Sequence, residues 1–167
     1  MAITKIQSES MNLADTYAFT GTVTGAGGVN TPAFEAYLSS TQSPSDNSWT
    51  KIQINTEVFD TASAYDNSSN YRFTVPSGQS GKYFVYGMAQ LYGTYDANDI
   101  SRLSIYKNGS SIGPNIQGYH DHYGSIQISC LENLSVSDYI EVYAYHNAGG
   151  SINTLGTSKF LGYRIIE

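Results

Sequence analysis

The sequence is poor in the residues that cross-link, interrupt or strongly charge a chain. Its 167 residues include one cysteine, one tryptophan and four prolines, and only 13% of them are charged. A single cysteine, Cys130, excludes an intrachain disulfide framework. Cys130 continues the apolar alternation of Ile126 and Ile128, which predicts a small core residue rather than a reactive thiol.

Positive charge and long hydrophobic runs are also scarce. The formal net charge is −6, and no cluster of Lys and Arg interrupts the acidic balance. Because non-specific nucleic-acid binding depends on cations that displace counterions, we expect no nucleic-acid partner. No window approaches the ~20 apolar residues of a membrane span, and the start "MAITKIQSES" lacks the apolar run of a secretory signal. We therefore expect no membrane span and no export by the ordinary secretory route.

Glycine and tyrosine, in contrast, are abundant, with 16 and 15 copies. Apolar residues alternate with polar ones in short runs such as "YRFTV", "SIQISCL" and "YIEVYAY", and turn sequences such as "KNGSS" and "NAGG" separate these runs. This spacing, without a convincing helical pattern, predicts an all-β sandwich of the jelly-roll kind.

The glycine-rich stretch "TGAGGVNTP", residues 24–32, divides the chain. We expect an N-terminal arm and linker at residues 1–31 and a single domain at residues 32–167. The arm is too short for a core of its own, so its apolar residues are expected to dock, either on the domain itself or on a larger particle. The candidate anchor residues are Ile3, Ile6, Met11, Leu13 and Phe19.

The domain resembles the globular head of complement C1q and the related tumour necrosis factor fold. The resemblance lies in "PAFEAYLSS", "WTKIQINTEVFDTASAYDNSSNYRFTVPSGQSGKYFVYG", "LSIYKNGS", "LSVSDYIEVYAYH" and "FLGYRII", in that order. It implies a ten-stranded jelly-roll sandwich that functions as a homotrimer. The arm is similar to N-terminal segments of bacteriophage virion proteins that carry such a domain.

Two tyrosine-rich runs give independent support for an interface. In "DYIEVYAYH", the small aliphatic residues share one face of a strand and the tyrosines share the other. In "KYFVYGMA", Tyr83 and Val85 are expected in the core, with their neighbours on the opposite face. Apolar-aromatic patches on a protein surface usually mark interfaces. The predicted trimer-interface residues are Phe84, Tyr86, Tyr139, Tyr143 and Tyr145.

The segment "GYHDHYGS", residues 118–125, carries the candidate ligands. In the family that the domain resembles, collagen-type members carry an aspartate that helps to hold calcium, and Asp121 matches its position. The next carboxylate of that family would be expected where Ser129 and Cys130 stand. His120 and His122 are a second candidate pair, for a transition metal. The alternative is a polar loop without any cofactor, in which Tyr119, His120, His122 and Tyr123, with nearby Asn115 and Gln117, contact a partner.

No motif for catalysis is present. The sequence contains no nucleophile elbow, no H-E-x-x-H pair and no phosphate-binding loop, and an EF-hand counted from Asp96 fails at Ser101 and Lys107. We expect a non-enzymatic, homotrimeric virion protein exposed on a phage particle. Its role is either a tail fibre or baseplate adhesin tip for host attachment, which touches a host-surface glycan or protein, or a capsid decoration. The alternative is a soluble C1q/TNF-like recognition or cytokine-like protein of cellular origin.

Overall fold

Two antiparallel sheets packed face to face form the part of the chain that this computed structural model describes, residues 30–113, 116–118 and 122–165. Sheet A contains β1 (Ala33–Tyr37), β3 (Thr56–Asp60), β6 (Gly81–Tyr92), β10 (Tyr123–Leu134), β12 (Asn153–Thr154) and β13 (Lys159–Arg164). Sheet B contains β2 (Thr50–Lys51), β4 (Tyr65–Asp66), β5 (Arg72–Thr74), β7 (Ser101–Lys107), β8 (Ser110–Ser111), β9 (Ile116–Gly118) and β11 (Tyr139–His146). The described residues include no helix, and therefore none that could cross a membrane.

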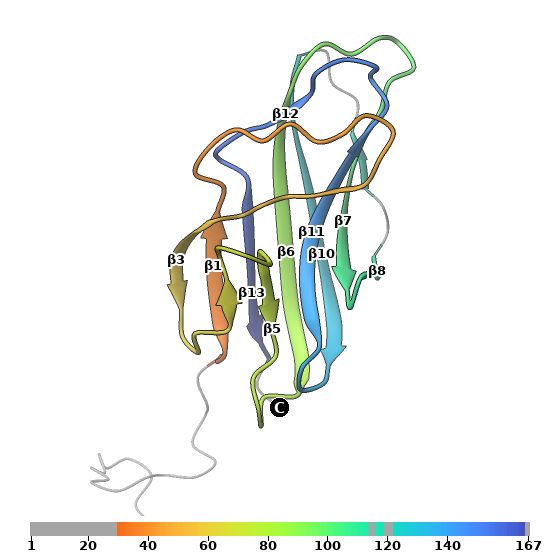
Figure 1. Cartoon of the computed structure of the whole chain (residues 1–167). Helices are drawn as coiled ribbons and strands as arrows, with labels where there is room; N and C mark the ends of the chain where they lie inside the picture. Colours follow the sequence, from red (N-terminus) through yellow and green to blue (C-terminus); the bar gives the residue numbers. More distant parts are fainter. Residues whose placement is uncertain (1–29, 114–115, 119–121, 166–167) are drawn as a thin grey trace, which may run out of the picture.

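The strand order is that of a jelly roll. Sheet A runs β10-β6-β13-β1-β3 with β12 beside β6, and sheet B runs β4-β5-β11-β7-β8 with β2 beside β11 and β9 beside β7. The long strands β6, β7, β10 and β11 alternate between the two sheets, so the chain passes repeatedly across the ends of the sandwich (Figure 1). The expected all-β jelly-roll sandwich is confirmed. The run "KIQINTEVF" is divided between β2 and β3, although Ile52 and Ile54 between them still fill the core.

Alternate residues of the strands form the core between the sheets. Tyr83 and Val85 of β6 are buried and Phe84 is not, so the predicted orientation of this strand is confirmed. The centre of the core is aromatic: Phe34 stacks on Phe73 at a ring separation of 4.7 Å. Gly162 permits this packing, because a side chain there would begin 3.0 Å from the Phe34 ring.

The two ends of the sandwich differ in what they contain. β1 begins where β13 ends, with Ala33 paired to Tyr163, so both strands reach the lower end of the molecule in Figure 1. At the opposite end, the connections before β2, after β6 and after β11 meet and bond to one another. We call these connections, residues 43–49, 93–100 and 147–152, the apical loops.

Candidate functional site

The outer surface of sheet A is rich in apolar side chains, and we call it the A face. It comprises Leu131, Phe84 and Tyr163 in one row across the strands, Tyr86, Leu161, Glu35 and Phe59 in the next, and Val58 beside them. The one carboxylate in these rows, that of Glu35, forms an ion pair with Lys159. The Phe84 and Tyr163 rings are 5.4 Å apart. Leu131 is 67% exposed, Val58 56% and Phe59 46%, so much of this apolar surface is in contact with water.

The distribution of exposed apolar side chains distinguishes the A face from the rest of the described surface. Six large hydrophobic residues are exposed in the part of the chain that the structure describes, and five belong to strands of sheet A. The sixth, Val136, directly follows β10. Exposed apolar residues that gather on one face mark an interaction surface, whereas scattered ones do not.

The outer surface of sheet B carries five aromatic rings, and we call it the B face; Trp49, Tyr106, Tyr143 and Tyr145 are connected by ring contacts, and Tyr139 packs against Arg72. It comprises Trp49, Tyr106, Tyr139, Tyr143 and Tyr145, with the cationic residues Lys51, Arg72 and Arg102. The Tyr106 and Tyr143 rings stack at 4.1 Å, and Trp49 lies 6.1 Å from Tyr106 and 5.5 Å from Tyr145. All five rings are half-buried, because each packs against its neighbours.

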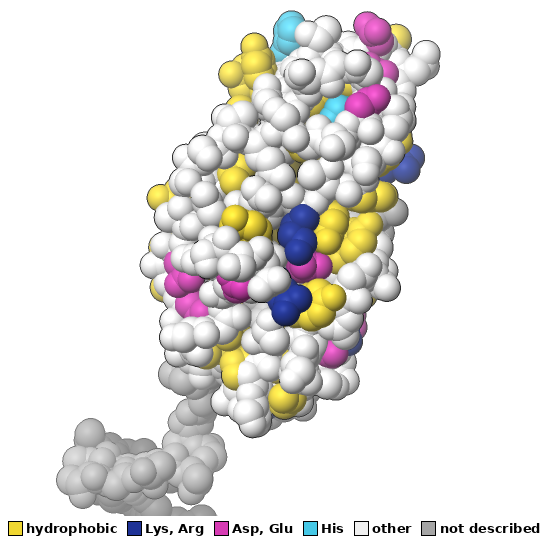
Figure 2. All heavy atoms as spheres, viewed as in Figure 1, with side chains coloured by type: hydrophobic (Ala, Val, Ile, Leu, Met, Phe, Trp, Pro, Cys, Tyr) yellow, Lys and Arg dark blue, Asp and Glu magenta, His cyan; other side chains and the backbone are white. Residues whose placement is uncertain are grey.

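Cationic side chains lie beside these rings. The Arg72 guanidinium is 4.1 Å from the centre of the Tyr139 ring, and the Arg102 guanidinium is 5.8 Å from that of Tyr145. Lys51 forms an ion pair with Glu141, which points outward but is only 2% exposed. Figure 2, which views the molecule from the side of sheet B, shows basic and acidic side chains within a hydrophobic patch.

The titration of two tyrosines reflects this packing. Burial, followed by the negative charge of Glu141, raises the pKa of Tyr143 to about 12. Burial also raises the pKa of Tyr106. Both rings therefore stay neutral well above physiological pH, and a hydrogen bond to the Glu141 side chain helps to keep the Tyr143 hydroxyl protonated.

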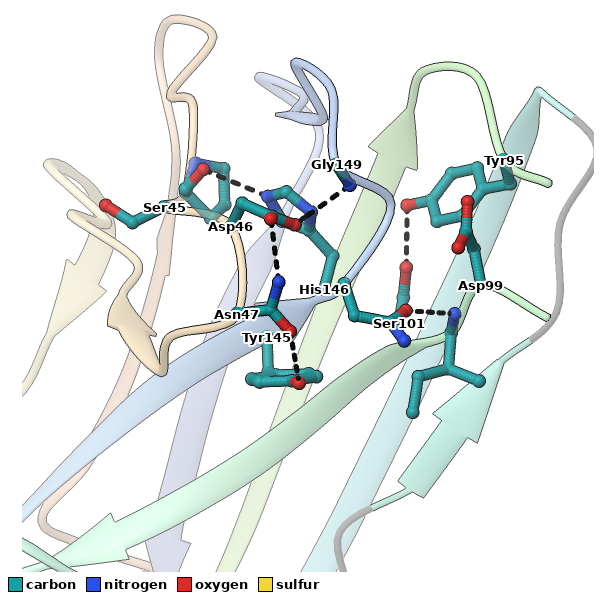
Figure 3. A network of polar contacts seen from close by, with 12 residues as sticks. Ser45, Asp46, Asn47, Tyr95, Asp99, Ser101, Tyr145, His146 and Gly149 are labelled. Atoms are coloured by element: carbon teal, nitrogen blue, oxygen red, sulfur yellow. Dashed lines mark hydrogen bonds and ion pairs between the residues drawn. The ribbon is translucent and has the colours of Figure 1, made fainter.

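A polar network connects the B face to the apical loops (Figure 3). The Tyr145 hydroxyl donates to Asn47 at 3.3 Å, and the Asn47 amide donates to Asp46 at 2.7 Å. Asp46 also accepts the Gly149 amide at 3.0 Å and lies 3.3 Å from a ring nitrogen of His146, which is buried. The network ties two apical loops together and fixes the Tyr145 end of the B face.

A second contact in this region explains the run "YDANDI". The Tyr95 hydroxyl and the Ser101 hydroxyl are 2.6 Å apart in the core, and the Asp99 carboxylate accepts the backbone amide of Asp96 at 2.7 Å. The Asp99 carboxylate therefore closes a turn within one apical loop, in agreement with the failed EF-hand match.

The segment "GYHDHYGS" is described only in part. A ring nitrogen of His122 lies 3.1 Å from the Gly93 carbonyl oxygen, and the Tyr123 ring, 63% exposed, packs 4.6 Å from that of Tyr92. The segment thus borders the apical loop that follows β6. The candidate residues Tyr119, His120 and Asp121 lie outside the described residues, as does Asn115, and so do the anchor residues of the arm. Among the described residues, no group of three potential ligands could hold a metal.

The five predicted interface residues fall into two sets. Phe84 and Tyr86 lie on the A face, whereas Tyr139, Tyr143 and Tyr145 lie on the B face, on the other side of the sandwich. The predicted burial of the small aliphatic residues of β11 is confirmed, so the tyrosines do face outward. Our sequence interpretation missed Trp49, Tyr106 and Leu131, although the alternation in "RLSIYK" indicates that Tyr106 faces outward.

Cys130 packs against the core but is only half-buried. Burial, followed by the nearby Glu132 carboxylate, raises the pKa of its thiol. A raised pKa keeps the sulfur in the unreactive thiol form at neutral pH, as expected for a structural cysteine.

Comparison with known proteins defines the fold class. No family model and no curated protein sequence matches the chain. The structure is similar to the globular domain of zebrafish complement 1qA protein, with a TM-score of 0.58, 16% identity, and coverage of 81% of this chain and 98% of that one. It is similar to murine APRIL at pH 5.0, with a TM-score of 0.58, 12% identity, and coverage of 80% and 98%. The chain therefore has the C1q/TNF-like jelly-roll fold.

Proposed function

We propose that the protein is a non-enzymatic homotrimer in the virion of a bacteriophage. Its arm, residues 1–31, contacts other virion proteins, and its jelly-roll head faces outward. Within this class, it serves as a tail fibre or baseplate adhesin tip that contacts a host glycan or protein, or as a capsid decoration (head fibre) protein. The observation that carries the homotrimer is the exposed apolar surface of the A face.

The A face suits contact with other copies of the chain. In a ring of three, each protomer offers two different surfaces, one to each neighbour, and we assign the A face, with Phe84 and Tyr86, to one of them. Three copies carry 3 × −6 = −18 formal charges, so apolar burial has to outweigh their repulsion. A stable obligate interface of this kind buries on the order of 2,000 Å² or more.

Light scattering of the full chain tests the homotrimer. With a chain mass of 18.2 kDa, we expect 3 × 18.2 = 54.6 kDa at every protein concentration across a hundredfold range. A mass of one chain throughout that range would contradict the proposal.

The absence of enzymatic activity is supported by the surroundings of the described histidines. His122 contacts a carbonyl oxygen, and His146 lies between the Pro44 carbonyl oxygen and the Asp46 carboxylate. Neither contact offers a serine or cysteine nucleophile to a histidine base, which acyl-transfer sites require.

The virion role is supported by the geometry of the chain ends and by the resemblance of the arm. Because β1 begins at the end opposite the apical loops, a particle-bound arm would point these loops outward. Deletion of residues 1–28 should shift the melting temperature by only a few degrees but abolish incorporation into phage particles. Loss of the folded trimer on this deletion would contradict the anchoring role.

The cellular alternative is favoured by one finding, the similarity to a complement domain and to murine APRIL. Mass spectrometry of purified phage particles distinguishes the two. We expect peptides of this chain in stoichiometric amount, and their absence from every particle fraction would favour a cellular recognition or cytokine-like protein.

For the segment "GYHDHYGS", we retain the proposal of a contact loop without bound metal. A chelator should leave the melting temperature unchanged, whereas a site saturated a hundredfold above its Kd with calcium or zinc would contribute about 2.7 kcal/mol. Joint replacement of His120, Asp121 and His122 by alanine should reduce host-cell adsorption without loss of stability. A large fall in stability would instead indicate a metal site.

A further inference from the structure

We propose that His146 and Asp46 form a proton-dependent switch in the apical loops. The loops are held together while both ring nitrogens of His146 carry a proton, and the loss of one proton releases them. The switch goes beyond the homotrimer and the virion role, because it assigns a regulation to the end of the sandwich opposite the start of β1. It does not depend on either proposal, since its contacts lie within one chain.

His146 is the last residue of β11, and its ring points into the sandwich. Val142 and Ala144 lie on the same side of the strand and are buried, whereas the intervening tyrosines face outward. The His146 side chain is only 2% exposed, so groups within the protein, rather than water, have to satisfy its two ring nitrogens.

Both ring nitrogens face hydrogen-bond acceptors (Figure 3). Nε2 lies 3.1 Å from the carbonyl oxygen of Pro44, and Nδ1 lies 3.3 Å from a carboxylate oxygen of Asp46. A carbonyl oxygen can only accept, so the Pro44 contact requires a proton on Nε2. In the neutral ring, Nδ1 then points a lone pair at the carboxylate and is buried without a hydrogen bond. A second proton, on Nδ1, turns this repulsive contact into an ion pair.

Burial and the ion pair act on the second proton in opposite directions. Burial penalises the charged ring, whereas the carboxylate of Asp46 favours it. Burial also penalises the neutral ring at this position, because Nδ1 is left without a partner. The contacts of His146 therefore favour the doubly protonated ring while the loops are closed. Histidine side chains gain and lose a proton between about pH 5 and 8, so the switch acts in this range.

Asp46 is the charged side chain that contacts this ring. Opposite the ring, β7 contributes Ser101, whose hydroxyl is 2.6 Å from that of Tyr95. Burial raises the pKa of Tyr95, which keeps this phenol neutral in the range of the switch. In the same loop as Tyr95, the Asp99 carboxylate binds the backbone amide of Asp96. The loop after β11 contributes no charged residue. The charge of the ring is therefore set mainly against Asp46.

The carboxylate of Asp46 connects the ring to two apical loops. One oxygen accepts the Gly149 amide at 3.0 Å, and the other accepts the side-chain amide of Asn47 at 2.7 Å. Asn47 also donates its backbone amide to the His146 carbonyl oxygen at 2.8 Å and accepts the Tyr145 hydroxyl. When Asp46 moves away from a neutral ring, residues 43–49 separate from residues 147–152, and the Tyr145 end of the B face is released.

Hydrogen exchange of the full-length protein, with millisecond labelling and mass spectrometry, tests the proposal. The protection of the Asn47 and Gly149 amides, corrected for the intrinsic pH dependence of exchange, is compared between about pH 5.5 and about pH 8.5. We expect this protection to fall about tenfold or more as the pH rises, the loss expected for one hydrogen-bonded charged contact. The Ser137 amide, which donates to the Val75 carbonyl oxygen at the other end of the sandwich, should keep its protection.

Single substitutions identify the two groups. Asp46→Asn keeps the shape of the side chain without its charge, and His146→Gln keeps a donor for the Pro44 carbonyl oxygen without a titrating ring. In both variants, we expect weak protection of the loops that no longer depends on pH. Because the Asp46 side chain is 37% exposed, Asp46→Asn should fold even if His146→Gln does not. Asp99→Asn removes one carboxylate from a neighbouring apical loop and is the matched control, which should retain the pH dependence of the parent.

Two further measurements separate His146 from other groups. His122→Gln removes a second titrating ring, which contacts the Gly93 carbonyl oxygen, and should leave the pH dependence at Asn47 and Gly149 unchanged. The nitrogen chemical shifts of the His146 ring, measured by nuclear magnetic resonance, report its protons directly. We expect two protonated ring nitrogens at about pH 5.5 and one at about pH 8.5.

Four outcomes would overturn the proposal. The first is equal protection of the Asn47 and Gly149 amides at both pH values. The second is protection that falls on acidification. The third is a pH dependence that persists in Asp46→Asn, which would assign it to another group. The fourth is a His146 ring that is already neutral at the acidic end of the range. A trimeric mass together with any of these leaves the homotrimer standing.

Discussion

The A face and the B face are the two outer surfaces of one sandwich, and the same alternation of strand residues builds both. They differ in how far their apolar side chains are exposed to water. On the A face, Leu131, Phe59 and Val58 are about half or more exposed. On the B face, four of the five aromatic rings contact one another, and the fifth, that of Tyr139, packs against the Arg72 guanidinium. Alternation therefore identifies outward-facing residues without showing whether they are already covered within one chain. An apolar surface that is exposed in the single chain is expected to be covered by another copy of the chain. A surface whose rings are already packed against neighbouring side chains does not need such a contact.

The largest expected effect is on the free energy of unfolding, from a substitution in the core that lies between the two sheets. Phe34 stacks on Phe73 and Tyr65 and meets Phe160 edge-on, and it is 1% exposed. Phe34→Ala should therefore lower the free energy of unfolding by about 3–5 kcal/mol and disturb both faces together. Denaturant unfolding measures the loss, with Phe34→Leu as a milder control. A loss below 1 kcal/mol would show that the two faces do not depend on this core.

Charge placed on the A face should abolish assembly. Leu131→Asp puts a carboxylate into an apolar contact, so we expect a mass of one chain by light scattering. Because Leu131 is mostly exposed in the single chain, the variant should remain folded. Ser110→Asp, at an exposed edge of sheet B, adds the same charge and should stay trimeric. If the two variants had the same mass, both trimeric or both of one chain, the A face would have no special role in assembly.

A paired alanine substitution separates the two faces further. Tyr143→Ala removes the ring that stacks on Tyr106 and should cost about 2 kcal/mol of unfolding free energy without a change in mass. Phe84→Ala should instead weaken the trimer. If Tyr143→Ala dissociates the trimer, Tyr143 belongs to the interface that the sequence predicted for it.

The smallest effect is expected at alkaline pH. The pKa of Tyr143 is raised to about 12 in the folded chain, above the ordinary value of 10.0. The folded state holds this proton more tightly, so its contribution to stability is complete below pH 10 and is lost as the pH rises toward 12. Tyr143→Phe keeps the ring without the titration. Between pH 10 and 12, the melting temperature of the Tyr143→Phe variant should fall by roughly 2–4 °C less than the melting temperature of the parent protein. Parallel curves for the two proteins would contradict this.

Part of this organisation was predictable from sequence and part was not. The period of two in "DYIEVYAYH" and "KYFVYGMA" gave the inward and outward sides of β11 and β6, since successive strand residues point to opposite faces. It could not show that Phe84 and Tyr143 lie on different sheets, because strand pairing depends on contacts distant in sequence. The contribution of Trp49 was also hidden, since its neighbours Tyr106 and Tyr145 are 57 and 96 positions away.

Hydroxyl-radical footprinting of the native assembly tests the difference between the two faces most directly. Side-chain oxidation, read by mass spectrometry, is compared between the parent protein and Leu131→Asp. We predict that Phe59, Phe84 and Tyr163 are protected in the parent and oxidised in the variant, while Trp49 and Tyr145 react equally in both. Protection of Trp49 and Tyr145 in the parent, with Phe59 and Phe84 equally reactive in both proteins, would contradict the account.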